Sequence, residues 1–331
     1  MRLSLIIPVY NRPDEIDELL ESLSKQDLTD DYEVVIVEDG SSLDCKLIVD
    51  NYPNLNISYF YKPNSGPGDS RNFGMRNAKG NYYIILDSDC ILPENYLSEV
   101  KKSLENDYVD CFGGVDDADQ SFSDIQKAIN FAMTSFLTTG GIRGGSEALT
   151  KFQPRSFNMG ISKEAFEASN GFGNVHPGED PDLAIRLWNL GFETRLFRNV
   201  KVYHKRRISW GKFKTQVHKF GKARVILNSW YPQYIKPTFL FPSLFLIGFV
   251  LSVFMTLFGL GFFFGLYILY FLVCLLLSTL KNRSLKIGLL SVYAVGIQFY
   301  GYGTGFLKAF YKINILRQRP EEALPEMFFL I

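Results

Sequence analysis

The sequence predicts an α/β domain, with a mostly parallel sheet covered by helices on both faces, followed by a helical hairpin in a membrane. Two observations support this architecture. Up to about residue 200, short β-branched apolar runs alternate with stretches whose apolar residues recur at helical spacing. Between residues 237 and 280, a run of 44 residues contains no charge. This is about twice the roughly 20 apolar residues that cross a bilayer, and a buried core helix would be far shorter.

Strands and helices alternate along the first part of the chain. Each predicted strand is a short run of mainly apolar residues, and each predicted helix has apolar residues three or four positions apart. The strands are expected at 3–9, 33–37, 57–61 and 82–86, and the helices at 14–23, 70–78, 93–104, 163–168 and 180–189. This order implies an open, mostly parallel sheet whose ligands bind beyond the carboxyl ends of the strands. Between 113 and 160 the pattern is irregular and rich in glycine, so we expect loops, including a mobile one at 140–145.

Acidic and basic residues are divided unevenly along the 331 residues, although the net charge is zero. Residues 1–200 hold 32 acidic and 18 basic side chains, whereas residues 201–320 hold 17 basic and no acidic ones. The basic part contains the uncharged run, so its charge suits anionic lipid head groups. A nucleic-acid partner is excluded, because the domain that would bind it is acidic.

Residues 209–236 predict a basic amphipathic helix at the membrane interface. Lysine and arginine are interspersed with Trp210 and Trp230 directly before the hydrophobic run. An ordinary solvated basic helix is the alternative. The run itself, 237–280, divides near Gly259 into two segments of about 20 residues, each long enough for a transmembrane helix.

The last part of the chain, 281–331, contains a third apolar stretch at 287–306. Two spans before it return the cations that follow them to the cytoplasmic side, as the positive-inside rule expects. A third span would place further cations outside, so a re-entrant or interfacial segment is favoured and a spanning helix is the alternative. The spacing of Gly301 and Gly305 suits close contact with a neighbouring helix.

The first residues carry no signal for export. The apolar run 3–9 is broken by Pro8 and is too short for the core of a signal peptide. The four cysteines are scattered without a CxxC pair, so neither a zinc site nor a disulfide framework is expected. We therefore predict a multi-pass protein of the inner or plasma membrane whose first domain, 1–208, lies in the cytoplasm.

Carboxylates cluster where the predicted strands end. Glu38 and Asp39 follow the second strand, and Asp87 and Asp89 follow the fourth. Two carboxylates one residue apart, at the edge of a parallel sheet, suit a hard cation such as Mg²⁺ or Mn²⁺ that bridges to phosphate oxygens. An Asp-rich turn is the alternative for this motif taken alone.

Five motifs occur in order, and together they are far more specific than any one of them. They are Leu5-Ile-Ile-Pro-Val-Tyr-Asn-Arg12, Val37-Glu-Asp-Gly-Ser41, Asn64-Ser-Gly66 followed by Arg71-Asn72, Leu86-Asp-Ser-Asp89, and Gly178-Glu-Asp-Pro-Asp-Leu183. Over residues 3–210 the chain resembles the inverting family 2 glycosyltransferases of the GT-A fold. The apolar tail is similar, much less specifically, to those of bacterial polysaccharide-assembly members.

The resemblance implies a donor site for a nucleotide-diphosphate sugar, with a UDP-sugar favoured. The residues implied to line it are Pro8, Tyr10, Glu38 and Asp39 at the nucleoside, Asn64, Gly66 and Arg71 beside the nucleotide, Asp87 at the ribose, and Asn158 at a sugar or phosphate. Either Glu38 or Asp39 can contact the base, because many relatives have Asp where this sequence has Glu38. Arg71 offers a planar donor fork suited to a phosphate or carboxylate. An ion pair that holds a helix is its alternative role.

The resemblance also implies a metal and a base. A divalent cofactor, Mn²⁺ or Mg²⁺, would be held by Asp89, and His204 is either a further ligand or a structural histidine. Asp180 would be the general base that takes the proton of the acceptor hydroxyl, with Glu179 as its catalytic neighbour. Crowded carboxylates raise the pKa of one member, which suits a base that works near neutral pH. Asp182 is expected to serve the helix N-terminus.

The predicted function is transfer of one sugar from a nucleotide-sugar donor to a saccharide acceptor, preferably lipid-linked, in cell-surface polysaccharide synthesis. The QxxRW motif of processive relatives does not occur, which favours a single transfer. A dinucleotide-dependent oxidoreductase is disfavoured, because the Gly66-Pro-Gly68 cluster has Arg71 where GxGxxG needs glycine. A non-catalytic membrane-anchored adaptor that binds nucleotide sugars is the remaining alternative, and the full set of acidic motif residues argues against it.

Overall fold

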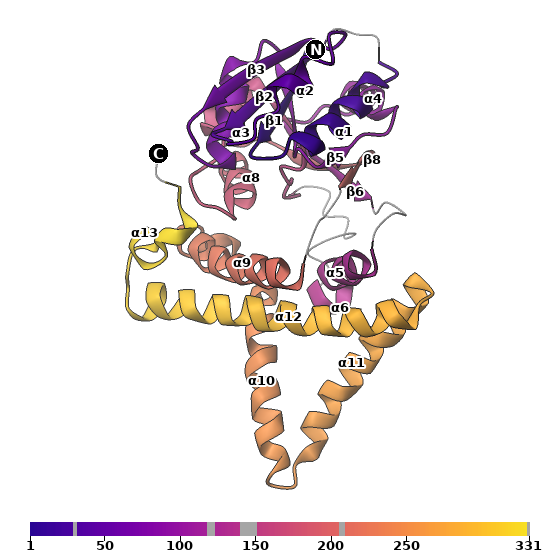
Figure 1. Cartoon of the computed structure of the whole chain (residues 1–331). Coiled ribbons are helices and arrows are strands. Elements are labelled where there is room, and N and C mark those ends of the chain that lie inside the picture. Colours follow the sequence, from indigo (N-terminus) through magenta and orange to yellow (C-terminus); the bar gives the residue numbers. More distant parts are fainter. Residues whose placement is uncertain (29–31, 118–122, 140–150, 205–208, 330–331) are drawn as a thin grey trace. The chain divides into compact units, whose positions relative to one another are not determined.

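The computed structural model describes residues 1–28, 32–117, 123–139, 151–204 and 209–329. The chain divides into two compact units, whose elements are labelled in Figure 1. Unit 1 comprises Met1–Gln120, Ala148–Lys205 and Phe328–Ile331, and unit 2 comprises Ser121–Glu147 and Arg206–Met327. Unit 1 therefore holds most of the predicted α/β domain, 1–208, together with the last residues of the chain, whereas Ser121–Glu147 and the residues from Arg206 belong to unit 2.

Unit 1 is built on one mixed sheet of eight strands. In spatial order they are β3 (Ile57–Lys62), β2 (Tyr32–Asp39), β1 (Leu3–Val9), β4 (Tyr82–Leu86), β7 (Asn158–Ser162), β6 (Cys111–Asp117), β8 (Thr194–His204) and β5 (Cys90–Ile91). The first four are parallel, as predicted, and β1 and β4 have the predicted bounds. Beyond β4 the sheet becomes mixed, because β7 runs antiparallel to both of its neighbours. The prediction of a mostly parallel sheet therefore holds for the half that carries the acidic motifs of β2 and β4. In the other half, β6 and β8 are parallel, and the remaining pairs are antiparallel.

Helices cover both faces of this sheet. Successive residues of a strand point to opposite faces, so the apolar residues of each strand pack against helices on both sides. The helices of unit 1 are α1 (Pro13–Ser24), α2 (Lys46–Val49), α3 (Pro67–Asn77), α4 (Tyr96–Asn106), α7 (Lys163–Ser169) and α8 (Glu179–Asn189). In β1, Leu5 and Ile7 join a core formed with α1 and α4. Ile6, between them, joins a second core with α3, α7 and α8. The site-bearing helices α3 and α8 thus share one face of the sheet.

The segment 113–160 is more regular than the sequence predicts, because it contains most of β6, the start of β7 and two helices. The sequence analysis did not predict β7 because Gly160 lowers the strand propensity of this segment. In the structure, Gly160 is required by packing: a Cβ there would lie 2.0 Å from the ring of Phe112. A glycine within a strand marks this kind of close approach. The loop predicted at 140–145 lies outside the described residues.

Unit 2 consists of helices. They are α5 (Asp124–Thr134), α6 (Phe136–Thr139), α9 (Trp210–Trp230), η1 (Pro232–Tyr234), η2 (Pro237–Phe239), α10 (Phe241–Thr256), α11 (Gly261–Asn282), α12 (Leu285–Phe310), η3 (Tyr311–Ile315), α13 (Pro320–Ala323) and η4 (Pro325–Met327). The predicted basic helix is α9, which ends well before residue 236. The run 237–280 forms the hairpin α10–α11, with a turn at Gly259.

Small residues let α9 and α12 pack closely. A Cβ at Gly305 would lie 2.1 Å from the carbonyl oxygen of His218, and one at Gly221 would lie 2.2 Å from that of Tyr302. A Cβ at Gly301 would lie 2.5 Å from Val217. The prediction that Gly301 and Gly305 seat a neighbouring helix is therefore confirmed, and the neighbour is α9.

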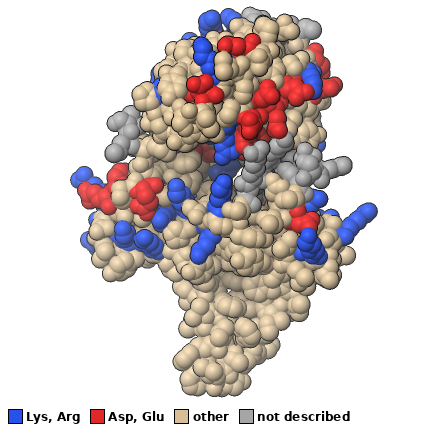
Figure 2. All heavy atoms as spheres, viewed as in Figure 1, with Lys and Arg blue, Asp and Glu red and all other residues tan. Residues whose placement is uncertain are grey.

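One helix in the described part of the chain, α11, is both long and apolar enough to cross a bilayer, with 22 residues. Its partner α10 has 16 residues, about 24 Å of helix against a hydrocarbon core of about 30 Å. Figure 2 shows this hairpin without charged side chains on the displayed face. The third stretch, 287–306, lies within the unbroken α12, whose Gln298, tyrosines and glycines reduce its hydropathy. Two full membrane spans therefore stay a prediction, as does the placement of α12.

Candidate active site

Arg71 on α3 joins two acidic motifs that are far apart in the sequence. Its guanidinium donates to Oδ1 of Asp87 at 2.9 Å and to Oε1 of Glu179 at 3.4 Å. It also lies over the ring of Phe172, 5.3 Å from the centroid. Arg71 is only 4% exposed, so loss of either carboxylate would leave this buried positive charge with one acidic partner in place of two. The structure thus brings three predicted site residues together at the carboxyl end of β4.

Glu179 is buried, and both of its oxygens have partners. Oε1 faces Nδ1 of His176 at 2.9 Å, and Oε2 accepts from the backbone N–H of Gly178 at 2.9 Å. Burial would raise the pKa of Glu179, but the hydrogen bond with His176 and the positive charges of His176 and Arg71 outweigh it and lower the pKa. Glu179 is therefore a fixed negative charge beside Asp180.

Asp180 has the opposite environment. Burial, and then the negative charge of Glu179, raise the pKa of Asp180 to about 6. Its Oδ2 accepts one long hydrogen bond, 3.3 Å, from the backbone N–H of Ser156. Its Oδ1 is buried and has no hydrogen-bond partner among the residues that the structure describes. A half-buried aspartate with an unpartnered carboxylate oxygen and a raised pKa has the properties of a general base.

Asp182, the third acid of this motif, forms an ion pair with Arg186 of its own helix, α8. Its Oδ2 accepts from Nε of Arg186 at 3.0 Å and from Nη2 at 2.8 Å. The same guanidinium donates to the carbonyls of Ser169 and Gly171. Through Arg186, Asp182 therefore helps to join α8 to the end of α7, and its predicted role at the helix N-terminus stays a prediction.

Asp39 organises the loop that precedes α3. Its carboxylate accepts from Nζ of Lys62 at 2.7 Å and from the backbone N–H groups of Ser65 and Gly66 at 2.9 and 3.0 Å. The side-chain amide of Asn64 donates to the carbonyl of Asp39 at 2.9 Å. Gly66 has φ 93°, a conformation that favours glycine. Predicted residues on β2 and on the loop before α3 are thus one hydrogen-bonded assembly.

Glu38 organises the neighbouring loop. It is fully buried, and its carboxylate accepts from the hydroxyl of Ser41, from the backbone N–H of Cys45 at 3.0 Å and from the hydroxyl of Tyr59 at 3.3 Å. Glu38 and Asp39 both have internal partners, so contact with a nucleoside base stays a prediction for either residue.

The loops that follow β1 and β2 are joined by Asn11, which the sequence analysis did not single out. Its backbone N–H donates to the hydroxyl of Ser41 at 2.7 Å, and its side-chain oxygen accepts from the N–H of Ser42 at 2.9 Å. Pro8 lies within β1, and Tyr10 next to Asn11 is 53% exposed. An exposed ring could stack on a base, and contact of Pro8 and Tyr10 with a nucleoside stays a prediction.

Arg12 and Glu15 are two further residues of this edge that the sequence analysis did not assign. Nη1 of Arg12 donates to both oxygens of Glu15, at 2.6 and 2.8 Å, and Ser88 of the DxD motif lies 3.5 Å from Glu15. The pKa of Arg12 is raised by this hydrogen bond and by the charges of Glu15, Asp89 and Asp87. The positive charge of Arg12 therefore lies near the acidic DxD motif. The three-residue spacing of Arg12 and Glu15 was the sequence feature from which their ion pair could have been predicted.

The DxD motif could hold a divalent metal only together with other ligands. Within the described ranges, no group of three or more His, Cys, Asp or Glu is placed to bind a metal. Asp87 and Asp89 nevertheless offer the carboxylate oxygens that Mg²⁺ and Mn²⁺ accept, and Mg²⁺ commonly uses one or two carboxylates plus substrate phosphates. The backbone of His204 pairs with Cys90, the residue after Asp89. The side chain of His204 lies outside the described part.

Asn158 has an internal position. It is fully buried, its Oδ1 accepts from the hydroxyl of Tyr96 at 2.8 Å, and its Nδ2 donates to the carbonyl of Val200 at 3.1 Å. Contact with a sugar or phosphate, as predicted, would require these hydrogen bonds to open. No signal in the sequence indicated this internal pairing, because loops were expected over 113–160 and Asn158 instead begins β7.

Residues 4–168 match the family model described as Glycosyl transferase family 2. This stretch, just under half of the chain, includes the acidic motifs of β2 and β4, and the match supports the predicted resemblance to family 2 glycosyltransferases. The match ends before α8, so Glu179 and Asp180 lie outside it.

Curated relatives match over about a third of this chain. The poly(ribitol-phosphate) β-N-acetylglucosaminyltransferase TarS of Staphylococcus aureus is 34% identical over 114 residues, which is 33% of this chain and 20% of that protein. The GalNAc(5)-diNAcBac-PP-undecaprenol β-1,3-glucosyltransferase of Campylobacter jejuni is 32% identical over 116 residues, 34% of this chain and 37% of that protein. The chain thus spans well under half the length of these relatives.

Solved structures with similar folds cover nearly the whole chain. The mannosyltransferase PcManGT of Pyrobaculum calidifontis, in complex with GDP-Man and Mn²⁺, has a TM-score of 0.56 and 17% identity, over 96% of this chain and 88% of that one. Residues 1–349 of S. aureus TarS give a TM-score of 0.50 and 19% identity, over 96% and 92% of the two chains. These likenesses support the predicted α/β fold as GT-A-like.

Proposed function

We propose that this chain transfers a sugar from a nucleotide-diphosphate sugar to an acceptor hydroxyl with inversion at the anomeric carbon, using Asp180 as the general base. One observation carries the proposal. Oδ1 of Asp180 is buried without a hydrogen-bond partner in the described structure, and the pKa of this carboxyl is raised to about 6. At neutral pH such a group is ionised, yet it binds a proton more strongly than an exposed aspartate does.

The proposed reaction is a single displacement. The acceptor oxygen forms a bond with the anomeric carbon while its proton passes to Asp180. The bond from that carbon to the diphosphate oxygen breaks on the opposite face, and the electron pair leaves with the diphosphate. Glu179 does not compete for the proton, because its oxygens are held by His176 and Gly178. Its charge instead keeps the proton affinity of Asp180 high.

The leaving diphosphate requires positive charge, for which this edge of the sheet has candidates. Arg71 is fixed by Asp87 and Glu179, and Arg12 is fixed by Glu15. We propose that Asp89, with Asp87 and His204 beside it, holds Mn²⁺ or Mg²⁺, which would neutralise charge on the diphosphate. The similar fold of PcManGT was solved with GDP-Man and Mn²⁺. For this chain a UDP-sugar is favoured by the motif resemblance alone.

The acceptor we propose is a lipid-linked saccharide at the cytoplasmic face of the inner or plasma membrane, for synthesis of a cell-surface polysaccharide. Three features support it: the apolar helix α11, the 17 basic and no acidic residues between 201 and 320, and the name of the C. jejuni relative, which includes an undecaprenol-linked substrate. Each Lys or Arg near an anionic surface contributes about 1 kcal/mol to membrane attraction. The α10–α11 hairpin would anchor the enzyme beside such an acceptor.

The experiment that tests the reaction is a donor screen on the purified full chain. UDP-, GDP- and dTDP-sugars are each supplied with and without Mn²⁺, together with a polyprenyl-diphosphate-linked saccharide in nanodiscs or the same saccharide free in water. We expect one nucleotide class to be released in step with glycosylation of the lipid-linked acceptor, with inverted anomeric configuration by NMR. A product with retained configuration would refute the single displacement. Equal rates on both acceptors would refute the lipid-linked preference.

A further inference from the structure

The last described residues of the chain are attached to the segment that leads into the candidate base. Phe328 forms an antiparallel bridge with Val175. The backbone N–H of Phe329 donates to the carbonyl of Asn174 at 3.0 Å. The chain therefore returns to unit 1 after unit 2 and runs, for two residues, along the stretch that precedes α8 and Asp180.

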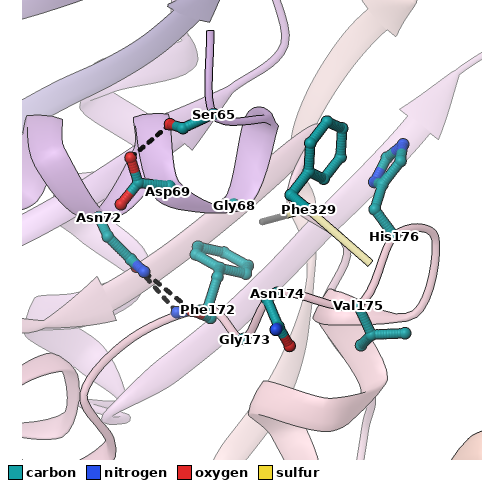
Figure 3. A pocket seen from close by; sticks show the side chains of 10 residues that line it. All are labelled: Ser65, Gly68, Asp69, Asn72, Phe172, Gly173, Asn174, Val175, His176 and Phe329. Atoms are coloured by element: carbon teal, nitrogen blue, oxygen red, sulfur yellow. Dashed lines mark hydrogen bonds between the residues drawn. The ribbon is translucent and has the colours of Figure 1, made fainter. Parts of the chain in front are cut away.

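Phe329 lines a small pocket, of about 20 Å³, between the start of α3 and the segment 172–176 (Figure 3). On one side, Asn72 already holds these two walls together. Its amide nitrogen donates to the carbonyl of Phe172 and its oxygen accepts from the N–H of the same residue, both at 2.8 Å. At the other side, where Gly66 and His176 lie, the ring of Phe329 provides the contact between the walls.

The ring contacts one residue from each wall. A Cβ built at Gly66 would lie 2.5 Å from Cδ2 of Phe329, so the ring rests against the backbone of this glycine. The backbone N–H of this same Gly66 donates a hydrogen bond to the carboxylate of Asp39 at 3.0 Å. The ring centroid of His176 lies 5.8 Å from that of Phe329, and the two side chains are neighbours in Figure 3.

Each of the two residues that the ring contacts is hydrogen-bonded to a residue of the candidate site. On the donor side, the loop of Gly66 is held by Asp39 at the end of β2. On the base side, Nδ1 of His176 lies 2.9 Å from Glu179, which directly precedes Asp180. A displacement of about 1 Å between reacting groups can cost about 10²-fold in rate, so a contact that fixes the distance between these two sides affects catalysis without touching substrate.

We propose that Phe329 is a positioning residue for glycosyl transfer: its ring holds the donor-side loop at Gly66 and the base-side segment at His176 in a fixed relation. This proposal rests on the function proposed above. Because the ring acts on the relation between donor and base, its loss affects the transition state more than it affects binding of the donor. Transfer to an acceptor therefore suffers more than hydrolysis of the donor by water, which needs no positioned acceptor.

The test compares variants of the full chain in nanodiscs. Phe329→Ala is expected to lower kcat for transfer by about 10–100-fold, to leave the Kd of the donor within about threefold, and to lower the ratio of transfer to donor hydrolysis by at least tenfold. Phe329→Tyr retains the ring and is expected to restore most of the rate. Deletion of residues 328–331 should resemble Phe329→Ala, whereas deletion of 330–331 alone is the matched control and should resemble the unaltered chain.

A purely structural role gives a different result. If Phe329→Ala only reduces the folded fraction, transfer and hydrolysis fall by the same factor and their ratio is unchanged, which would overturn the proposal. Transfer within twofold of the unaltered chain would overturn it as well. An unaltered chain that neither transfers nor hydrolyses any donor would instead refute the proposed function.

Hydrogen exchange tests the contact itself, independently of activity. Phe329→Ala is expected to increase amide exchange in peptides that cover 63–68 and 172–180, and to leave peptides of β1 and β4 unchanged. Unchanged exchange in both pocket walls would show that the ring does not hold them, and would overturn the proposal even if no donor were accepted.

Discussion

The end of β2 and the start of α8 each carry two adjacent acidic residues, and the two pairs have very different surroundings. At β2, Glu38 and Asp39 have carboxylates that accept from hydroxyl, ammonium and backbone N–H donors. At α8, Glu179 is similarly occupied, whereas Oδ1 of Asp180 has no partner in the part of the chain that the structure describes. Both places have a glutamate followed by an aspartate, but they differ in how many hydrogen-bond donors surround the carboxylates.

This difference separates a carboxylate that builds a loop from one that can accept a proton. A buried charge with donors on all sides is stabilised as a charge, and it holds backbone in place. A buried charge with one long hydrogen bond and an ionised neighbour is poorly stabilised, so the proton affinity of that group rises. We therefore assign loop organisation to Glu38 and Asp39, and we propose proton transfer for Asp180.

The largest expected effect is loss of metal-dependent turnover. Asp89→Ala removes one of the two carboxylates that could share a cation with the diphosphate, so nucleotide release should no longer respond to added Mn²⁺. Asp44→Ala, an exposed change on the loop after β2, is the matched control and should keep the response. Turnover in Asp89→Ala that still increases with Mn²⁺ would exclude Asp89 as a ligand.

The next effect in size concerns the base. Asp180→Asn is expected to reduce transfer by about 10²–10⁴-fold, the usual contribution of a general base. Donor affinity should change little, because the base acts on the acceptor. Asp182→Asn is the control, since Asp182 is paired with Arg186. If Asp180→Asn transfers normally while Glu179→Gln does not, the roles of the two acids are reversed.

Stability should change in opposite directions at the two pairs. Asp39→Asn removes the nearer of the two carboxylates that pair with the buried ammonium of Lys62, the other being Asp69, so the variant is expected to be less stable. Breaking a buried ion pair completely costs about 3–5 kcal/mol, which is the upper limit here. Asp180→Asn instead removes a poorly stabilised buried charge, so at pH 7.5 it is expected to raise the melting temperature of the full chain in detergent. Thermal unfolding followed by tryptophan fluorescence checks both signs, with Asp44→Asn as the reference. A lower melting temperature for Asp180→Asn would show that its carboxylate is better stabilised than its contacts indicate.

Much of the fold could be predicted, because four strands of unit 1 are short apolar runs with clear boundaries. β1 and β4 have the predicted limits, and the helices that follow them are in the predicted places. The far half of the sheet could not be predicted, since β7 contains Gly160 for a packing reason that only the position of Phe112 reveals. The hairpin 237–280 was evident from its lack of charge, but the 16-residue length of α10 was not.

The candidate site was predictable at the level of motifs and not of contacts. Sequence spacing predicts that acidic residues gather at strand ends, and Asp87 and Asp39 do lie there. It gives no sign that Arg71 pairs with Glu179, which is 108 positions away, or that Phe329 rests on Gly66. The motif resemblance assigns different roles to Asp180 and Asp182, but spacing alone does not reveal that Arg186 pairs with Asp182 or that a single backbone N–H reaches Asp180.

The pH dependence of transfer tests the assignment of Asp180 most directly. Only the ionised carboxylate accepts a proton, and the pKa of Asp180 is raised to about 6. Transfer at saturating donor should therefore be constant above about pH 7 and fall with decreasing pH through about 6. Glu179→Gln removes a negative charge that raises this pKa, so the fall should move to lower pH. A rate that stays constant down to pH 4.5, or a fall at the same pH in Glu179→Gln, would contradict the assignment.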